Sequence, residues 1–121
     1  VADLRDLEYK VKRAIGIRGA KYIHIFVPCP LGWGSPSNET IKLARMVKEC
    51  GLFPVYEAEH GEVVSVSRIR KQIPVEEYMR PQRRYAHLFG KTPATKVIAK
   101  IQAMADRNIK KFGLLEEGGN R

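Results

Sequence analysis

Cys29 is the residue whose type and setting point most directly to chemistry. It lies between Pro28 and Pro30, at the end of the apolar run 22–27. Because proline fixes φ and lacks an N–H donor, the thiol is held on a stiff stretch of backbone. A thiol in this setting can ligate a metal or an iron–sulfur cluster, act as a nucleophile, or fill buried apolar space. The residue types alone leave these three roles open.

Motifs that would complete a catalytic or metal site around Cys29 are missing from the sequence. It contains no glycine-rich phosphate loop, no Cys-x-x-Cys pair and no recognisable Ser-His-Asp context. We therefore predict no catalytic residue, and a zinc or cluster site would need ligands from outside this chain. Cys50 and His24 are predicted to lie in the core, and His60 is predicted to lie exposed in a turn.

Positive charge is concentrated in the second half of the chain, which has a net charge of +9 overall. Residues 1–67 contain 9 Lys and Arg against 8 Asp and Glu, whereas residues 68–121 contain 13 against 5. A basic half favours an acidic partner, such as another subunit or a nucleic acid, or forms a solvated surface. Within this basic half, residues 78–87 interleave aromatic and basic side chains, which could stack on nucleic-acid bases or form an intersubunit surface. These residues are Tyr78, Arg80, Arg83, Arg84, Tyr85 and His87.

Size and composition predict one small domain or part of a larger one. The 121 residues are 44% apolar, which is enough for a hydrophobic core. Two cysteines do not make a disulfide framework, which favours a reducing, cytoplasmic setting. No apolar run approaches the ~20 residues of a membrane span, and the N-terminus lacks the pattern of a signal peptide. The chain opens without Met inside a helical pattern, so we expect it to be cut from a longer sequence.

The hydrophobic pattern predicts an α/β chain. Residues 3–15 have the spacing of an amphipathic helix, and the apolar run 21–27 is typical of a strand buried on both faces of a parallel sheet. The loop 28–38, rich in Pro, Gly and Ser, follows this strand. The other predicted elements are a helix at 39–50 stopped by Gly51, strands at 53–59 and 62–67 around a His60-Gly61 turn, a short helix that begins in 74–78, a turn at 85–89, a final helix capped by Thr92-Pro93 and a frayed tail at 116–121. The apolar face predicted for the last helix comprises Val97, Ile101, Met104, Ala105 and Phe112.

Two motifs, in this order, resemble the thiamine-diphosphate-binding β subunit of 2-oxoacid:ferredoxin oxidoreductases, most closely the pyruvate-type enzymes. In that family a strand leads into Cys-Pro-Thr-Gly-Trp, and a helix follows with Trp-Pro-Leu-Tyr-Glu after it. The matching stretches here are Cys29-Pro30-Leu31-Gly32-Trp33 and Phe53-Pro54-Val55-Tyr56-Glu57, with Leu31 in place of Thr. The second motif, Pro-Val-Glu-Glu-Tyr-Leu-x-x-Gln-x-Arg-Phe-x-His-Leu, is matched by residues 74–79 and 82–88. The resemblance covers about residues 5–90.

The resemblance implies the C-terminal part of a thiamine-diphosphate-binding fold, with a β-hairpin and a helical C-terminal extension. Residues 1–60, with the cluster-ligand loop 28–38, would end the cofactor-binding domain, and residues 61–121 would be an extension between subunits. The family holds a proximal [4Fe-4S] cluster with four cysteines, and the one after the strand carries over to Cys29 as a metal ligand. The motifs for thiamine diphosphate and Mg²⁺ lie upstream in the family, so no residue here carries them over.

The implied function is oxidative decarboxylation of a 2-oxoacid, pyruvate by default, by a multisubunit cytoplasmic complex. Electrons would pass through [4Fe-4S] clusters to ferredoxin or a related acceptor, with the use of coenzyme A left open. This chain would not be catalytic alone, and neither a membrane nor a nucleic acid is an expected partner. Two alternatives are a basic nucleic-acid- or subunit-binding module without a catalytic role, and a cysteine-nucleophile enzyme.

Overall fold

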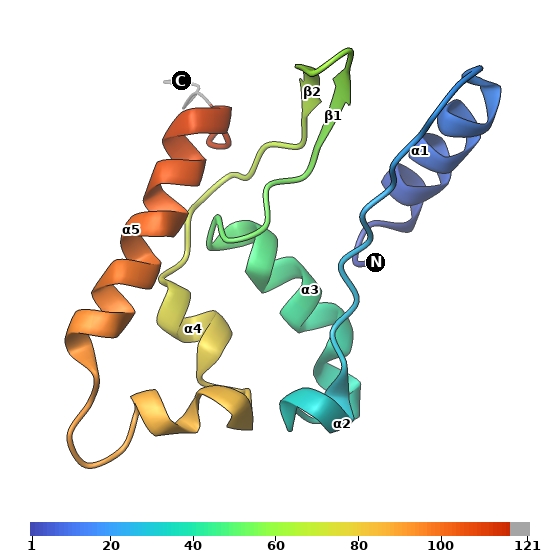
Figure 1. Cartoon of the computed structure of the whole chain (residues 1–121). Helices are drawn as coiled ribbons and strands as arrows, with labels where there is room; N and C mark the ends of the chain where they lie inside the picture. The colour runs from blue at the N-terminus through green and yellow to red at the C-terminus, as the bar shows by residue number, and fades with distance from the viewer. Residues whose placement is uncertain (117–121) are drawn as a thin grey trace.

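The core of the protein is built from three helices, α3 (Thr40–Glu49), α4 (Val75–Met79) and α5 (Thr95–Phe112), in a computed structural model that describes residues 1–116. The three helices lie together in Figure 1, and the short 3-10 helix η2 (Arg83–Leu88) continues from α4. The buried side chains that form this core are Leu43, Val47, Cys50, Val75, Tyr78, Met79, Leu88, Ile98 and Ala105. The helices predicted at 39–50 and from 74–78 are therefore confirmed, and the turn predicted at 85–89 overlaps η2.

Gly51 follows α3 and ends it, which confirms the helix stop predicted from the sequence. Gly51 also allows α5 to approach the end of α3 closely. A single turn of 3-10 helix, η1 (Ser37–Glu39), leads into α3. At the other end Gly51 has φ 85°, in the left-handed region that favours glycine. A Cβ atom built on Gly51 would lie 2.8 Å from Ile109 Cγ1 and 3.0 Å from the Ala105 carbonyl oxygen. The packing of α3 against α5 thus requires glycine at this position.

A β-hairpin follows α3, as predicted. Strands β1 (Tyr56–Glu59) and β2 (Glu62–Val66) pair antiparallel, with a register shift between Glu57 and Ala58. The turn residues His60 and Gly61 have φ angles of 52° and 86°, which suits a two-residue type I′ turn, and His60 is exposed as expected. Within residues 1–116 this hairpin is the whole of the β-sheet structure. The described chain is thus helices with one small antiparallel sheet, which is compatible with a fragment of an α/β fold.

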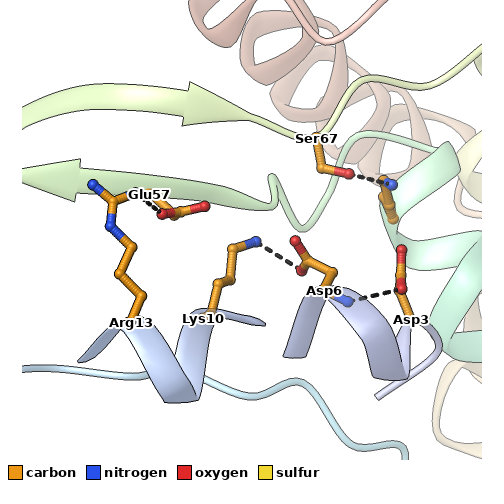
Figure 2. Close-up of polar contacts among 7 residues, drawn as sticks. Asp3, Asp6, Lys10, Arg13, Glu57 and Ser67 are labelled. Atoms are coloured by element: carbon orange, nitrogen blue, oxygen red, sulfur yellow. Dashed lines mark hydrogen bonds and ion pairs between the residues drawn. The ribbon is translucent and has the colours of Figure 1, made fainter. Parts of the chain in front are cut away.

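Helix α1 (Leu4–Gly16) confirms the amphipathic helix predicted at 3–15, but it stands apart from the core. The Asp3 side chain caps it by accepting a 3.1 Å hydrogen bond from the Asp6 backbone N–H, and Lys10 forms a 2.7 Å ion pair with Asp6. None of its residues is buried. Figure 2 shows Arg13 reaching across to Glu57 on β1, at 2.6 Å, and Arg13 also pairs with Glu59. Polar contacts at the surface therefore join α1 to the hairpin.

The prediction of a strand at 21–27 is wrong, because the structure has no strand there. Residues 21–29 are extended without regular structure, and the side chains of Tyr22 and Val27 are 85% and 55% exposed. A strand needs a neighbour to satisfy its N–H and C=O groups, and the described residues place none beside this segment. His24, predicted to lie in the core, is exposed for the same reason and contacts Phe53 only at its edge, with ring centroids 5.1 Å apart.

Helix α5 buries only part of the face predicted for it: Ala105 is completely buried, and Ile101 and Phe112 are partly buried against the core. The buried residues are Ile98, Ala105 and Ile109, whereas Val97 and Met104 are 46% and 52% exposed. The helix carries apolar residues on two adjacent stripes, so packing against α3 and α4 selects between them. It begins at Thr95 without a side-chain cap, so Thr92-Pro93 does not cap it as predicted.

The predicted frayed tail at 116–121 begins with an ordered residue. Glu116 donates a 3.0 Å backbone hydrogen bond to the Ile69 carbonyl, and Ile69 forms an isolated β-bridge with Leu115. The rest of that tail, 117–121, lies outside the described residues. Within the part of the chain that is described, no helix is long and apolar enough to cross a membrane.

Candidate functional site

Cys29 lies at the start of a single helical turn, α2 (Pro30–Trp33), which gives its loop a defined shape. Its backbone is extended, with φ −105° and ψ 100°, and its carbonyl accepts a 2.9 Å hydrogen bond from the Trp33 N–H. Gly34, at φ 64°, then reverses the chain, and the Ser35 N–H donates to the Pro30 carbonyl at 3.1 Å. The thiol is free and exposed. The loop therefore presents a rigid, accessible thiol, and this geometry disfavours the buried structural role.

Gly32 leaves open space beside the Cys29 thiol, and a metal group bound to the thiol would need such space. A Cβ atom built on Gly32 would lie 3.3 Å from Cys29 Sγ, so any larger residue would crowd the sulfur. A thiolate is the ligand that iron–sulfur clusters use, and glycine next to it allows a bulky inorganic group to approach. The donor and its surroundings fit such a group. Among residues 1–116 no three His, Cys, Asp or Glu side chains gather to complete a metal site.

Trp33 fixes the loop to the helical layer through Arg84. The Arg84 guanidinium carbon lies 3.7 Å from the centroid of the Trp33 ring, a close cation–π contact. The Phe26 ring also packs against Trp33, with ring centroids 5.6 Å apart. The Arg83 backbone N–H donates to the Gly34 carbonyl at 3.3 Å. The loop after Cys29 therefore rests on the segment that begins η2.

Gly34 lies so close to η2 that another residue would not fit. A Cβ atom built there would lie 2.6 Å from Arg83 Cβ, and φ 64° independently favours glycine. The neighbouring Ser35 Oγ is buried without a hydrogen-bond partner among the described residues. The first and second sequence motifs thus meet here, although some 50 residues separate them in the chain.

The aromatic and basic segment 78–87 does not form one exposed face. Tyr78 is 2% exposed, burial raises the pKa of its hydroxyl, and Gln82 beside it is completely buried. Arg80 pairs with Glu76 at 3.0 Å and covers the Phe89 ring. Because Tyr78 belongs to the core, it cannot stack on a base, so the structure favours a supporting role for this segment over nucleic-acid binding.

Cys50 is confirmed as a core residue. It is completely buried, and its Sγ lies 3.4 Å from the Val47 carbonyl oxygen as a hydrogen-bond donor. Burial raises the pKa of the Cys50 thiol to about 11. A thiol with this pKa stays protonated near neutral pH, so Cys50 is suited neither to nucleophilic attack nor to ligation.

Sequence reasoning missed the contact of Arg84 with Trp33. The two residues belong to different motifs, and nothing in their spacing shows that they touch. The sequence offered one weak indication, because each motif places an aromatic residue a few positions after a proline: Trp33 after Pro30, and Tyr85 after Pro81. Their physical contact required the fold.

Comparison with known proteins identifies relatives over most of the chain, although no protein-family model matches it. Over 110 residues it is 46% identical to the pyruvate synthase subunit PorB of Methanosarcina barkeri, a match that covers 91% of this chain and 37% of that protein. It is 40% identical over 109 residues to PorB of Methanocaldococcus jannaschii, covering 90% and 35%. The ketoisovalerate oxidoreductase subunit VorB of Pyrococcus abyssi is 34% identical over 90 residues, covering 73% and 29%.

These relatives define the class as subunits of 2-oxoacid oxidoreductases. Within that class the chain belongs to the family of PorB-type subunits of 2-oxoacid:ferredoxin oxidoreductases, which confirms the resemblance drawn from the two motifs. The chain spans about a third of the length of the curated relatives it matches.

Proposed function

We propose that this chain forms the C-terminal part of the thiamine-diphosphate-binding subunit of a 2-oxoacid:ferredoxin oxidoreductase that oxidatively decarboxylates pyruvate. Two relatives at 46% and 40% identity are PorB subunits of pyruvate synthase, which supports pyruvate over other 2-oxoacids. The observation that carries the proposal for the site is the free Cys29 thiol, exposed at the start of α2 with Gly32 leaving room beside it. In this proposal Cys29 supplies one of the four cysteine ligands of a proximal [4Fe-4S] cluster.

The residues around Cys29 have defined tasks in this role. The cluster, when bound, would accept and release single electrons. Pro28 and Pro30 stiffen the backbone on either side of the thiol, and the hydrogen bond between Trp33 N–H and Cys29 C=O holds the turn that presents it. Leu31, 97% exposed, offers no hydroxyl beside the loop where the family has threonine. Hydrogen bonds near a cluster tune its potential, so Leu31 would alter that potential.

Other functions of the complex belong to residues outside this chain. We propose that thiamine diphosphate, Mg²⁺ and the three remaining cluster cysteines are held there, and that ferredoxin or a related carrier accepts the electrons. The division into a cofactor-domain end at 1–60 and an intersubunit extension at 61–121 is part of the same proposal. The net positive charge of residues 68–121 supports contact with an acidic subunit or carrier.

The two cysteines of the chain provide a matched test of the ligand assignment. We expect Cys29→Ser to lower or shift the paramagnetic resonance signal of the proximal cluster in the reduced, anaerobically purified complex. Cys50→Ala should leave that signal unchanged and only reduce stability, by about 1–2 kcal/mol, because it truncates a core side chain. A Cys29→Ser complex with an unaltered cluster spectrum would contradict the assignment.

A further inference from the structure

The Arg84 side chain contacts two aromatic rings and donates two side-chain hydrogen bonds. Its guanidinium carbon lies 3.7 Å from the Trp33 ring centroid and 4.6 Å from that of Tyr85. Its Nε donates to Gln82 Oε1 at 2.8 Å, and its Nη2 donates to the Tyr78 hydroxyl at 3.0 Å. Gln82 and Tyr78 are themselves buried. The orientation of the guanidinium is therefore determined by the core.

No carboxylate neutralises Arg84 within residues 1–116. The ion pairs of the described residues involve other basic side chains. The partners of Arg84 are neutral oxygens and aromatic rings, and its residue is half-buried. A half-buried cation without a counterion exerts a field on its surroundings that solvent screens only in part.

Arg84 and Gly32, which lies beside the Cys29 thiol, border the same small surface cavity, which is open to solvent. This cavity, of ≈320 Å³, is lined by Leu31, Gly32, Trp33, Gly34, Arg83 and Arg84. Gly32 is the residue whose built Cβ would lie 3.3 Å from Cys29 Sγ. Trp33 is in turn hydrogen-bonded through its N–H to the Cys29 carbonyl. A chain of contacts thus runs from the core through Arg84 and Trp33 to the backbone of Cys29.

We propose that Arg84 is a positioning residue for Cys29, which clamps Trp33 to hold the α2 turn and places an uncompensated positive charge beside the group that the thiol binds. This inference rests on the proposed function for the identity of that group, an anionic [4Fe-4S] cluster. The clamp itself involves only residues of this chain. Loss of Arg84 should therefore loosen the loop whether or not a cluster is present, and it should also change the redox behaviour of a bound cluster.

The first measurement is hydrogen exchange of the loop amides in the assembled complex, before and after removal of iron with a chelator. We expect Arg84→Ala to speed exchange of the amides in residues 29–35 by about tenfold in both states, while exchange within α3 stays unchanged. Arg84→Lys should restore part of the protection, because ammonium keeps the cation–π contact but loses the two forked hydrogen bonds. Arg80→Ala is the matched control, since Arg80 covers Phe89 and lies outside the cavity.

The second measurement is the midpoint potential of the proximal cluster, followed by paramagnetic resonance. Removal of a nearby positive charge should make reduction of an anionic cluster harder, so Arg84→Gln should give a more negative potential than Arg84→Lys or Arg80→Ala. Wild-type loop exchange in Arg84→Ala, or the same potential in Arg84→Gln and Arg84→Lys, would overturn the proposal. If Cys29→Ser keeps the cluster while Arg84→Ala still loosens the loop, the ligand assignment fails and the clamp stands.

Discussion

At the scale of single residues, the two cysteines lie in opposite environments, and we therefore expect their thiols to differ in reactivity. Cys29 is exposed at the start of α2, and Cys50 is completely buried between α3 and the rest of the core. The same side chain is thus accessible to solvent in one place and a small buried apolar group in the other. The difference arises from burial, because both residues carry an unmodified thiol.

The reactivity of the two thiols should differ accordingly. We expect iodoacetamide at neutral pH to alkylate Cys29 in the folded, cluster-free chain and to leave Cys50 unmodified until the chain unfolds. Mass spectrometry of the alkylated peptides checks this, with Cys29→Ser as the control that should take up no label when folded. Labelling of Cys50 at the rate of an unfolded chain would contradict its burial.

Cys50 also predicts how stability depends on alkaline pH. The pKa of the Cys50 thiol is about 11 in the folded chain and 9.0 for an unperturbed thiol, so the folded state holds the proton more tightly. The associated stability is fully present below about pH 9 and is lost as the pH rises toward 11. Urea unfolding across this range should show a steeper loss for the wild type than for Cys50→Ala. Equal slopes in the two proteins would contradict the prediction.

At the scale of elements, glycines set how closely the helices and loops approach. Gly51 permits the contact of α3 with α5, and Gly34 permits the contact of the α2 loop with η2. Both have positive φ and both face atoms that a Cβ would strike. Gly61 also has positive φ, at 86°, but nothing lies within 4 Å of the Cβ position. The hairpin turn therefore needs backbone freedom only, whereas the other two sites need space as well.

Gly51→Ala and Gly61→Ala form a matched pair that separates these two effects. Both introduce backbone strain at a similar φ, of about 1 kcal/mol. Gly51→Ala should also force α5 away from α3, because one of the close atoms is the Ala105 carbonyl oxygen of the backbone. We expect Gly51→Ala to lower the free energy of unfolding by about 1–3 kcal/mol more than Gly61→Ala. Equal values from denaturant titrations would show that space at Gly51 is unimportant.

At the scale of the whole molecule, the core and the N-terminal arm (residues 1–29) are held differently. The core of α3, α4 and α5 is apolar, whereas α1 is joined to the hairpin through Arg13, Glu57 and Glu59. A groove of ≈1560 Å³ separates the arm from α3 and β1. Val1 reaches Phe26 within the arm, where its ammonium donates to the Phe26 carbonyl at 3.3 Å. Apart from the Phe26 carbonyl, the backbone groups of 21–27 have no backbone hydrogen-bond partner among residues 1–116.

Pairing of that segment in the complete complex is a prediction at this scale. Its composition, rich in Ile, Val and aromatic residues, is typical of a buried strand, and the match covers only 37% of the PorB subunit of Methanosarcina barkeri. We expect amides of 21–27 to exchange with solvent about tenfold or more slowly in the assembled complex than in the isolated chain. Equal exchange would mean that the segment stays unpaired, and the amides of α3 serve as a reference that is protected in both.

Elements whose stability is local could be predicted from the sequence. Helical spacing marked α1 and α3, and the His60-Gly61 pair marked the hairpin, because these features depend on neighbours only a few residues away. The two sequence motifs, which occur in the same order as in the family, also indicated the family and drew attention to Cys29. The cluster-ligand role of Cys29 stays a prediction, and so does the division of the chain at residue 60.

The folded structure was needed to reveal the features that depend on distant neighbours. It showed that 21–27 has no strand partner within the described residues, that α5 buries Ile98 and Ile109 in place of Val97 and Met104, and that Arg84 stacks on Trp33. A sheet ladder, a choice between two helical stripes and a cation–π contact each need a partner brought from elsewhere in the chain. Sequence spacing does not contain that information, because folding creates these contacts between residues that are far apart in sequence.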